Sequence, residues 1–175
     1  MSRSESGRGD PLDDMVNLVD LIREPALARI YTYVERTGET TVKELVEELG
    51  LAERTAYDYV NKLQGAGFLR TAGSDRPARY TVGEIDFTVD AGGETRHITP
   101  EFVHAIALSE TDEDVEVYLE KYGVDGLATA LEYAREYVDG NVNHRIVARE
   151  LDIAPLEASI ILQALEDVVA DDETE

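Results

Sequence analysis

Apolar residues recur at helical spacing at the start of the chain, with polar residues between them. Over residues 12–23 the apolar positions lie three and four apart, which predicts one amphipathic helix. Pro25 suits the first turn of a second helix, because its fixed φ fits a helix and its missing N–H is not needed there. Gly38 is expected to end that helix.

A short helix, a tight turn and a longer helix follow. Thr41 and Glu44 are spaced as a capping box, which predicts a helix that begins after Thr41 and continues to residue 49. Gly50 turns the chain, and the next helix is expected over about residues 52–66.

After this helix the apolar spacing changes from helical to extended. Residues 68–72 and 78–82 flank a turn over 73–77 and predict a β-hairpin with a basic tip. Residues 85–89 and 95–98 predict another hairpin, which either extends the same sheet or leads into the next module.

The rest of the chain again has helical spacing. Thr99 and Pro100 suit the start of one helix, and Thr111 is expected to cap the next, which ends at Gly123. Three more helices are expected: one that carries Leu127 and ends at Gly140, one over 143–151 and one over 155–169.

The C-terminal helices repeat the pattern of the earlier short and long helices. Residues 145–165 align with residues 43–63 at a constant offset of 102, and the apolar positions coincide. The second copy's longer helix, PLEASIILQALED, has no basic residue, so DNA phosphates would repel it. We expect this helix to lie in a core or a dimer interface, although any two short amphipathic helices joined by a turn would align similarly.

The predicted fold class is mainly α with a small β-hairpin wing: a winged helix-turn-helix domain followed by a C-terminal helical module. Four segments are expected: a disordered N-terminus over 1–11, the winged domain with its extra hairpin over 12–98, a helical dimerisation or regulatory module over 99–170, and an acidic tail over 171–175.

Charge changes this picture. The 38 acidic and 16 basic residues give a net charge of −22, and only Lys43, Lys62 and Lys121 are lysines. Such acidic, lysine-poor composition is typical of cytoplasmic proteins from salt-loving organisms, because molar salt screens the self-repulsion. The alternative is an acidic mesophilic protein that avoids nucleic acid. Locally, however, residues 54–80 carry five basic and two acidic side chains, which is where a polyanion would bind.

The segment VKELVEELGLAERTAYDYVNKLQGAGFL, residues 42–69, resembles the winged helix-turn-helix regulators of bacteria and archaea, of the ArsR, MarR and TrmB types. Its apolar positions fall where that motif packs two helices together, and Gly50 lies in the turn. The resemblance implies a winged helix over about residues 25–83 whose second helix reads the major groove. The expected DNA contacts are Thr41, Arg54, Thr55, Tyr57, Asn61 and Lys62, with Arg76 and Arg79 of the wing on phosphates or in a minor groove.

Other chemistry is poorly supported. The chain has no cysteine, and His97, His104 and His144 are scattered, so we expect no metal site and no cofactor. Nucleotide loops, nucleophile elbows and zinc signatures do not occur in the sequence, which argues against an enzyme. Pairs of tyrosines four residues apart, at 118/122 and 133/137, suit core packing or a dimer interface better than a ligand pocket.

We therefore expect a sequence-specific transcriptional regulator that binds double-stranded DNA as a homodimer in the cytoplasm, without a membrane span. The competing interpretation is a protein-interaction adaptor whose winged helix does not bind DNA. A third interpretation refines the first: an unidentified small-molecule effector controls the DNA-binding module through the C-terminal helices.

Overall fold

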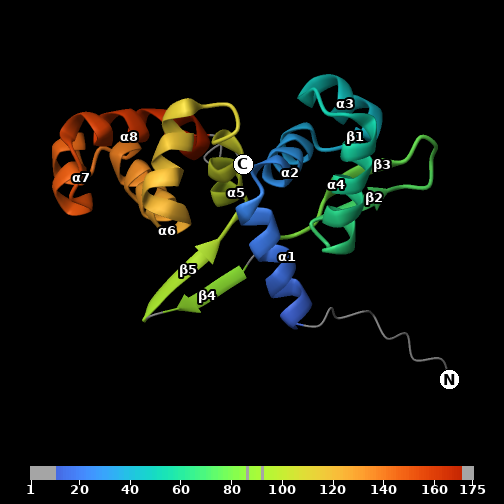
Figure 1. The fold of residues 1–175 in the computed structure, drawn as a ribbon, viewed down its shortest axis with the longest axis horizontal. Helices are drawn as coiled ribbons and strands as arrows, with labels where there is room; N and C mark the ends of the chain where they lie inside the picture. Colours follow the sequence, from blue (N-terminus) through green and yellow to red (C-terminus); the bar gives the residue numbers. More distant parts are fainter. Residues whose placement is uncertain (1–10, 86, 92, 171–175) are drawn as a thin grey trace. The chain divides into compact units, whose positions relative to one another are not determined.

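The computed structural model describes residues 11–85, 87–91 and 93–170, and the chain divides into two compact units between Glu84 and Ile85 (Figure 1). Of the segment 1–11, expected to be disordered, residues 1–10 lie outside the described residues, as does the acidic tail over 171–175, whereas Pro11 already begins a helix. Among those described, no helix combines the length and apolar character needed to cross a membrane.

The first unit has the element order of a winged helix-turn-helix. Its sheet is antiparallel with strand order β1-β3-β2, so the short strand β1 pairs with the second strand of the hairpin. The sequence pattern did not predict β1, which contains only two residues. The elements are α1 (Pro11–Arg23), α2 (Pro25–Thr37), β1 (Thr40–Thr41), α3 (Val42–Leu49), α4 (Glu53–Gly65), β2 (Leu69–Ala72) and β3 (Arg79–Val82).

The apolar faces predicted from the sequence form the core of this unit. Each fully buried leucine, valine or isoleucine contributes about 1.5–3 kcal/mol relative to exposure, so these faces fix how the helices pack. The buried side chains are Leu27, Ile30, Tyr31 and Val34 of α2, Leu45 of α3, Ala56, Val60 and Leu63 of α4, and Phe68 and Leu69 at the entrance to the wing.

The base of the wing depends on a close backbone approach. The Gly83 N–H donates to the Phe68 carbonyl oxygen at 2.8 Å, which joins the two ends of the β2–β3 hairpin. A Cβ atom at Gly83 would lie 2.0 Å from the Gly67 carbonyl oxygen, so only glycine fits there without a backbone shift.

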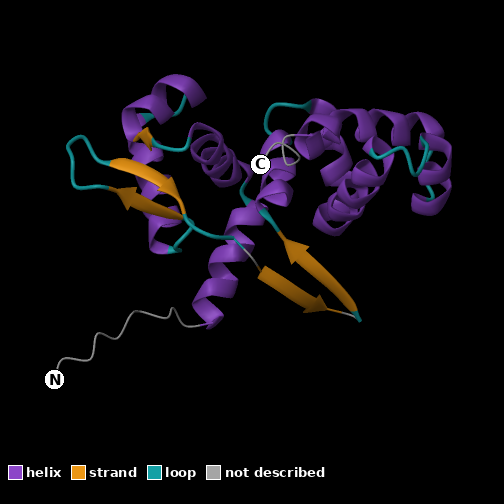
Figure 2. Cartoon of the chain, turned by 180° about the vertical axis from the view of Figure 1, so that it is seen from behind, coloured by secondary structure: helices purple, strands orange, loops and turns teal. Residues whose placement is uncertain are grey.

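The second unit is built from β4 (Phe87–Ala91), β5 (Glu94–Ile98), α5 (Pro100–Leu108), α6 (Glu113–Val138), α7 (His144–Leu151) and α8 (Pro155–Ala170). Strands β4 and β5 form a two-stranded sheet of their own and do not extend the wing (Figure 2). The expected boundary after residue 98 is therefore misplaced, because this hairpin belongs to the second unit.

One detail of α6 differs from the sequence-based prediction. Its N-cap is Asp112 instead of Thr111, because the Asp112 carboxylate accepts from the backbone N–H groups of Asp114 and Val115. As the sequence predicts, the regular helix is interrupted at Gly123, whose φ of 71° and ψ of −175° are non-helical, and a second helical segment follows it. The buried carboxylate of Glu101 on α5 accepts two hydrogen bonds from Arg135, which ties α5 to α6.

Helices α7 and α8 have the same local geometry as α3 and α4. Helix α7 begins at His144, which is 102 residues after α3 begins at Val42. The turn residues Gly50 and Asp152 are also 102 apart, and both adopt the left-handed conformation. The chain thus contains a second helix-turn-helix, as its apolar pattern indicated.

Replacing Gly83 by alanine should lower the free energy of unfolding by about 1–3 kcal/mol, because the added methyl group overlaps the Gly67 carbonyl. Gly65→Ala is the matched control: Gly65 is helical with open space around it, so alanine should stabilise by up to about 1 kcal/mol. Chemical denaturation of both variants measures the difference, and equal stabilities would contradict the close approach.

Candidate nucleic-acid interface

One face of helix α4 packs in the core, and the opposite face is exposed to solvent. Ala56, Val60 and Leu63 are at most 1% exposed and lie on one side of the helix at helical spacing. The helix carries no side-chain N-cap, because Ala52 stands at that position. Packing against the core, rather than capping, therefore fixes the rotation of α4 about its axis.

The outward face of α4 presents hydrogen-bonding groups. Arg54 and Asn61 are exposed, and Tyr57 is 48% exposed, a large value for an aromatic ring. Thr55 is half-buried at the edge of this face, and the exposed Asp58 lies within it. Arginine and asparagine make paired hydrogen bonds to guanine and adenine edges, so this face has the chemistry for reading bases.

Lys62, which was also expected on DNA, is engaged within the protein. Its ammonium lies 3.3 Å from a carboxylate oxygen of Asp20 on α1 and 3.3 Å from one of Glu24 before α2. Although partial burial opposes it, hydrogen bonds to these two carboxylates raise the pKa of Lys62. Lys62 therefore joins α4 to the N-terminal helices, and a phosphate would compete with two carboxylates for it.

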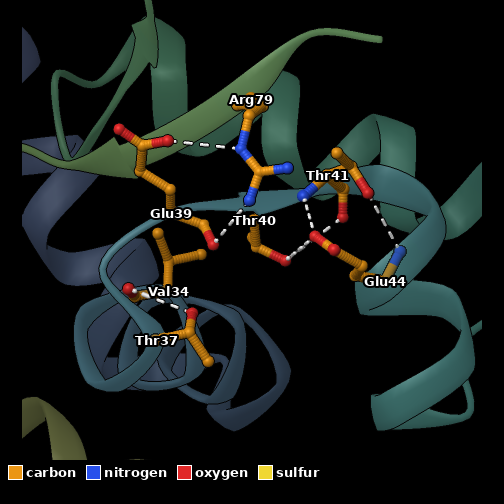
Figure 3. A network of polar contacts seen from close by, with 7 residues as sticks. All are labelled: Val34, Thr37, Glu39, Thr40, Thr41, Glu44 and Arg79. Carbon is orange, nitrogen blue, oxygen red and sulfur yellow. Dashed lines mark hydrogen bonds and ion pairs between the residues drawn. The ribbon is translucent and has the colours of Figure 1, made fainter.

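Thr41, which was expected on DNA, has a structural role at the start of α3. It is 7% exposed, and its hydroxyl accepts a hydrogen bond from the Glu44 N–H at 3.2 Å (Figure 3). The Glu44 carboxylate in turn accepts from the Thr41 N–H at 2.7 Å and from the Thr40 hydroxyl at 3.1 Å. The predicted capping box is confirmed. Within it the Thr41 hydroxyl serves as an acceptor, and burial leaves little of this side chain accessible.

Arg79 is likewise held by the protein. Its Nε donates to the Glu39 carboxylate at 3.2 Å and its Nη2 to the Glu39 carbonyl at 3.4 Å, so β3 is tied to the loop before β1 (Figure 3). Arg76, in the hairpin loop, is exposed as expected of a wing residue. Arg70 on β2 is exposed too, and the sequence-based prediction omitted it although it lies in the basic segment.

The structure therefore divides the eight expected contact residues into two groups. One group faces outward and consists of Arg54, Thr55, Tyr57, Asn61 and Arg76, to which Arg70 is added. The other group is bound within the protein and consists of Thr41, Lys62 and Arg79.

In the part of the chain that the structure describes, no three His, Asp or Glu side chains converge as a metal ion would require. Tyr118 is buried and packs against Tyr122, with ring centroids 4.5 Å apart. Burial raises the pKa of Tyr118 to about 12. Tyr118 thus packs in the core of the second unit, whereas Tyr122 is half-buried and donates its hydroxyl hydrogen bond to Glu157 at 2.9 Å.

Comparison with known proteins gives one finding. Residues 109–174 match a family of unknown function, DUF7437. No curated protein and no solved structure matches the chain. The matched segment lies in the second unit and contains its helix-turn-helix, whereas the candidate interface lies in the first unit.

The hydrogen bonds of the capping box predict how the stability of the protein depends on pH. Hydrogen bonds from the Thr41 backbone and the Thr40 hydroxyl lower the pKa of Glu44. Its stabilising contribution is therefore present above the unfolded value of about 4.3 and is lost as the pH falls through the folded pKa. Glu44→Gln should lower stability at neutral pH and reduce the loss of stability on acidification.

Glu47→Gln is the control for this experiment, because it removes the same charge from the same helix at an exposed site whose only described ion pair is with Lys43. Thermal unfolding between about pH 3 and 7 compares the two variants. If both variants follow the same pH curve, the capping box does not contribute in this way.

Proposed function

We propose that the protein is a cytoplasmic, sequence-specific DNA-binding transcriptional regulator that acts by binding and not by catalysis. One observation carries the proposal: the outward face of α4 presents Arg54, Tyr57 and Asn61 next to an exposed cationic hairpin. In a chain with a net charge of −22, residues 54–80 are a locally basic segment, with five basic and two acidic side chains.

In this proposal α4 enters the major groove. Arg54 and Asn61 lie seven residues apart on one face, about two helical turns, so they reach different base pairs. Tyr57 lies between them and suits a phosphate or a thymine methyl group. Arg70 and Arg76 on the hairpin bind the backbone of the same duplex.

Salt affects how such a protein finds DNA. At about 1 M salt the Debye length is about 3 Å, so the overall negative charge no longer repels DNA at a distance. Direct hydrogen bonds to bases then carry a larger share of the binding free energy than phosphate attraction does. We also propose a homodimer, because modules of this kind read two half-sites related by two-fold symmetry.

A protein-interaction adaptor is the second candidate. The observation in its favour is that Asp58 lies on the outward face of α4, where it would repel a phosphate. The exposed arginines on both sides of Asp58, in α4 and in the hairpin, favour DNA instead.

The test begins by selecting preferred duplexes from a random library. On the selected site, Arg54→Ala and Asn61→Ala should each weaken binding by about 1–3 kcal/mol and relax base preference. Gln163→Ala is the matched control, because Gln163 occupies the position of Asn61 in the second helix-turn-helix and is also exposed. Fluorescence anisotropy measures all three variants; failure to select any preferred duplex favours the adaptor.

The wing makes a different prediction. Replacing Arg70 and Arg76 together by alanine should weaken binding similarly on all sequences and flatten the salt dependence by about one unit per lost phosphate contact. The control replaces Arg145 and Arg149 on α7, which changes the net charge equally at exposed sites in the other unit. If both double variants lower the salt slope alike, the effect is one of net charge and the hairpin makes no contact.

A further inference from the structure

The second helix-turn-helix presents an apolar face where the first presents a polar one. At the offset of 102, Leu156 of α8 stands at the position of Arg54, and Ile160 stands at that of Asp58. Leu156 is 72% exposed and Ile160 is 36% exposed. Val117 of α6 is 53% exposed as well. The other side of α8 is buried in the core of the second unit, so core packing accounts for that side, whereas this face is exposed in the single chain.

These three side chains belong to one cavity of about 330 Å³. This volume is at the lower end of the range of small-molecule sites. The cavity lies between the first turns of α6 and α8, wholly within the second unit and within the segment that matches DUF7437. Its lining consists of Glu113, Asp114, Val117, Tyr118, Ala154, Leu156, Glu157, Ile160 and Ile161.

Carboxylates line the cavity, but they are not equally available. Glu157 is already neutralised, because it accepts from Lys121 at 2.9 Å and from the Tyr122 hydroxyl at 2.9 Å. The hydrogen bond from Lys121 lowers the pKa of Glu157 most, and the one from Tyr122 lowers it further. Glu113 and Asp114 are exposed in the first turn of α6. Among the described residues, no Lys or Arg side chain forms an ion pair with either carboxylate. Two negative charges therefore remain for a bound molecule.

We propose that this cavity binds a small organic cation with an apolar body. The apolar body packs against Leu156, Ile160 and Val117, and the cationic group lies near Glu113 and Asp114. The Tyr118 side chain, which is 4% exposed, also forms part of the lining. The proposal concerns the second unit alone and does not depend on whether the first unit binds DNA.

The size of the cavity favours a small molecule over a second copy of the chain as its occupant. A stable dimer buries about 800 Å² on each subunit, whereas the cavity volume of about 330 Å³ lies within the range of small-molecule sites.

Three probes of nearly equal shape and different charge test the proposal on the full-length chain: 4-phenylbutylamine, 4-phenylbutan-1-ol and 4-phenylbutyrate. In about 0.2 M KCl the protonated amine should bind about threefold to fivefold more tightly than the alcohol, and the anion should bind most weakly. In about 2 M KCl the three affinities should converge, because salt screens the charges but not the apolar contact. Isothermal titration calorimetry measures each affinity.

Variants separate the two parts of the site. Leu156→Gln should weaken the amine and the alcohol alike, by about fivefold, and Val117→Gln should do the same from the other helix. Glu113→Gln with Asp114→Asn should leave alcohol binding intact and abolish the preference for the amine. Glu53→Gln with Asp58→Asn is the control, because it removes the same charge from the first turns of α4 in the other unit.

The proposal is overturned if the alcohol binds wild type as tightly as the amine in low salt, or if Leu156→Gln and Val117→Gln both bind like wild type. It is also overturned if sedimentation shows a dimer that Leu156→Gln dissociates while no probe binds, since the cavity would then be covered by a second copy.

Discussion

The complete burial of one face of α4 is the constraint on which the candidate interface depends. Ala56 and Val60 are 0% exposed and Leu63 is 1% exposed, so α4 cannot rotate without removing apolar area from the core. The helical period then directs Arg54, Tyr57 and Asn61 outward. Lys62 reinforces this arrangement through its ion pairs with Asp20 and Glu24, and these surface pairs contribute less than the core does.

One apolar pattern produces two helix-turn-helix units with different surfaces. The buried positions Ala56 and Ala158 correspond, and Gly50 and Asp152 both supply the left-handed residue of the turn. Glycine and aspartate both tolerate this conformation, so the turn survives the change of residue. The outward faces are free of this packing constraint, which is why Leu156 can stand where the first unit has Arg54.

Several cations of the described chain are paired with carboxylates of other elements. Arg79 is held by Glu39, Lys121 by Glu157, and Arg135 by the buried Glu101. These pairs tie together elements that are distant in sequence, and they engage cations whose side chains are still 39–56% exposed. The proposed DNA binding depends on where the arginines of α4 and the hairpin lie rather than on the number of cations.

The pattern of residues along the chain predicted the mainly helical fold, the hairpins, the Thr41–Glu44 capping box and the second helix-turn-helix, because each follows from contacts between near neighbours in the chain. It did not determine β1, whose pairing partner Tyr80 is forty residues away, or that β4 and β5 form a separate sheet. Nor did it distinguish the free arginines from Lys62 and Arg79. Residue type gives a side chain its charge, but only tertiary packing decides which carboxylates come within reach of that charge.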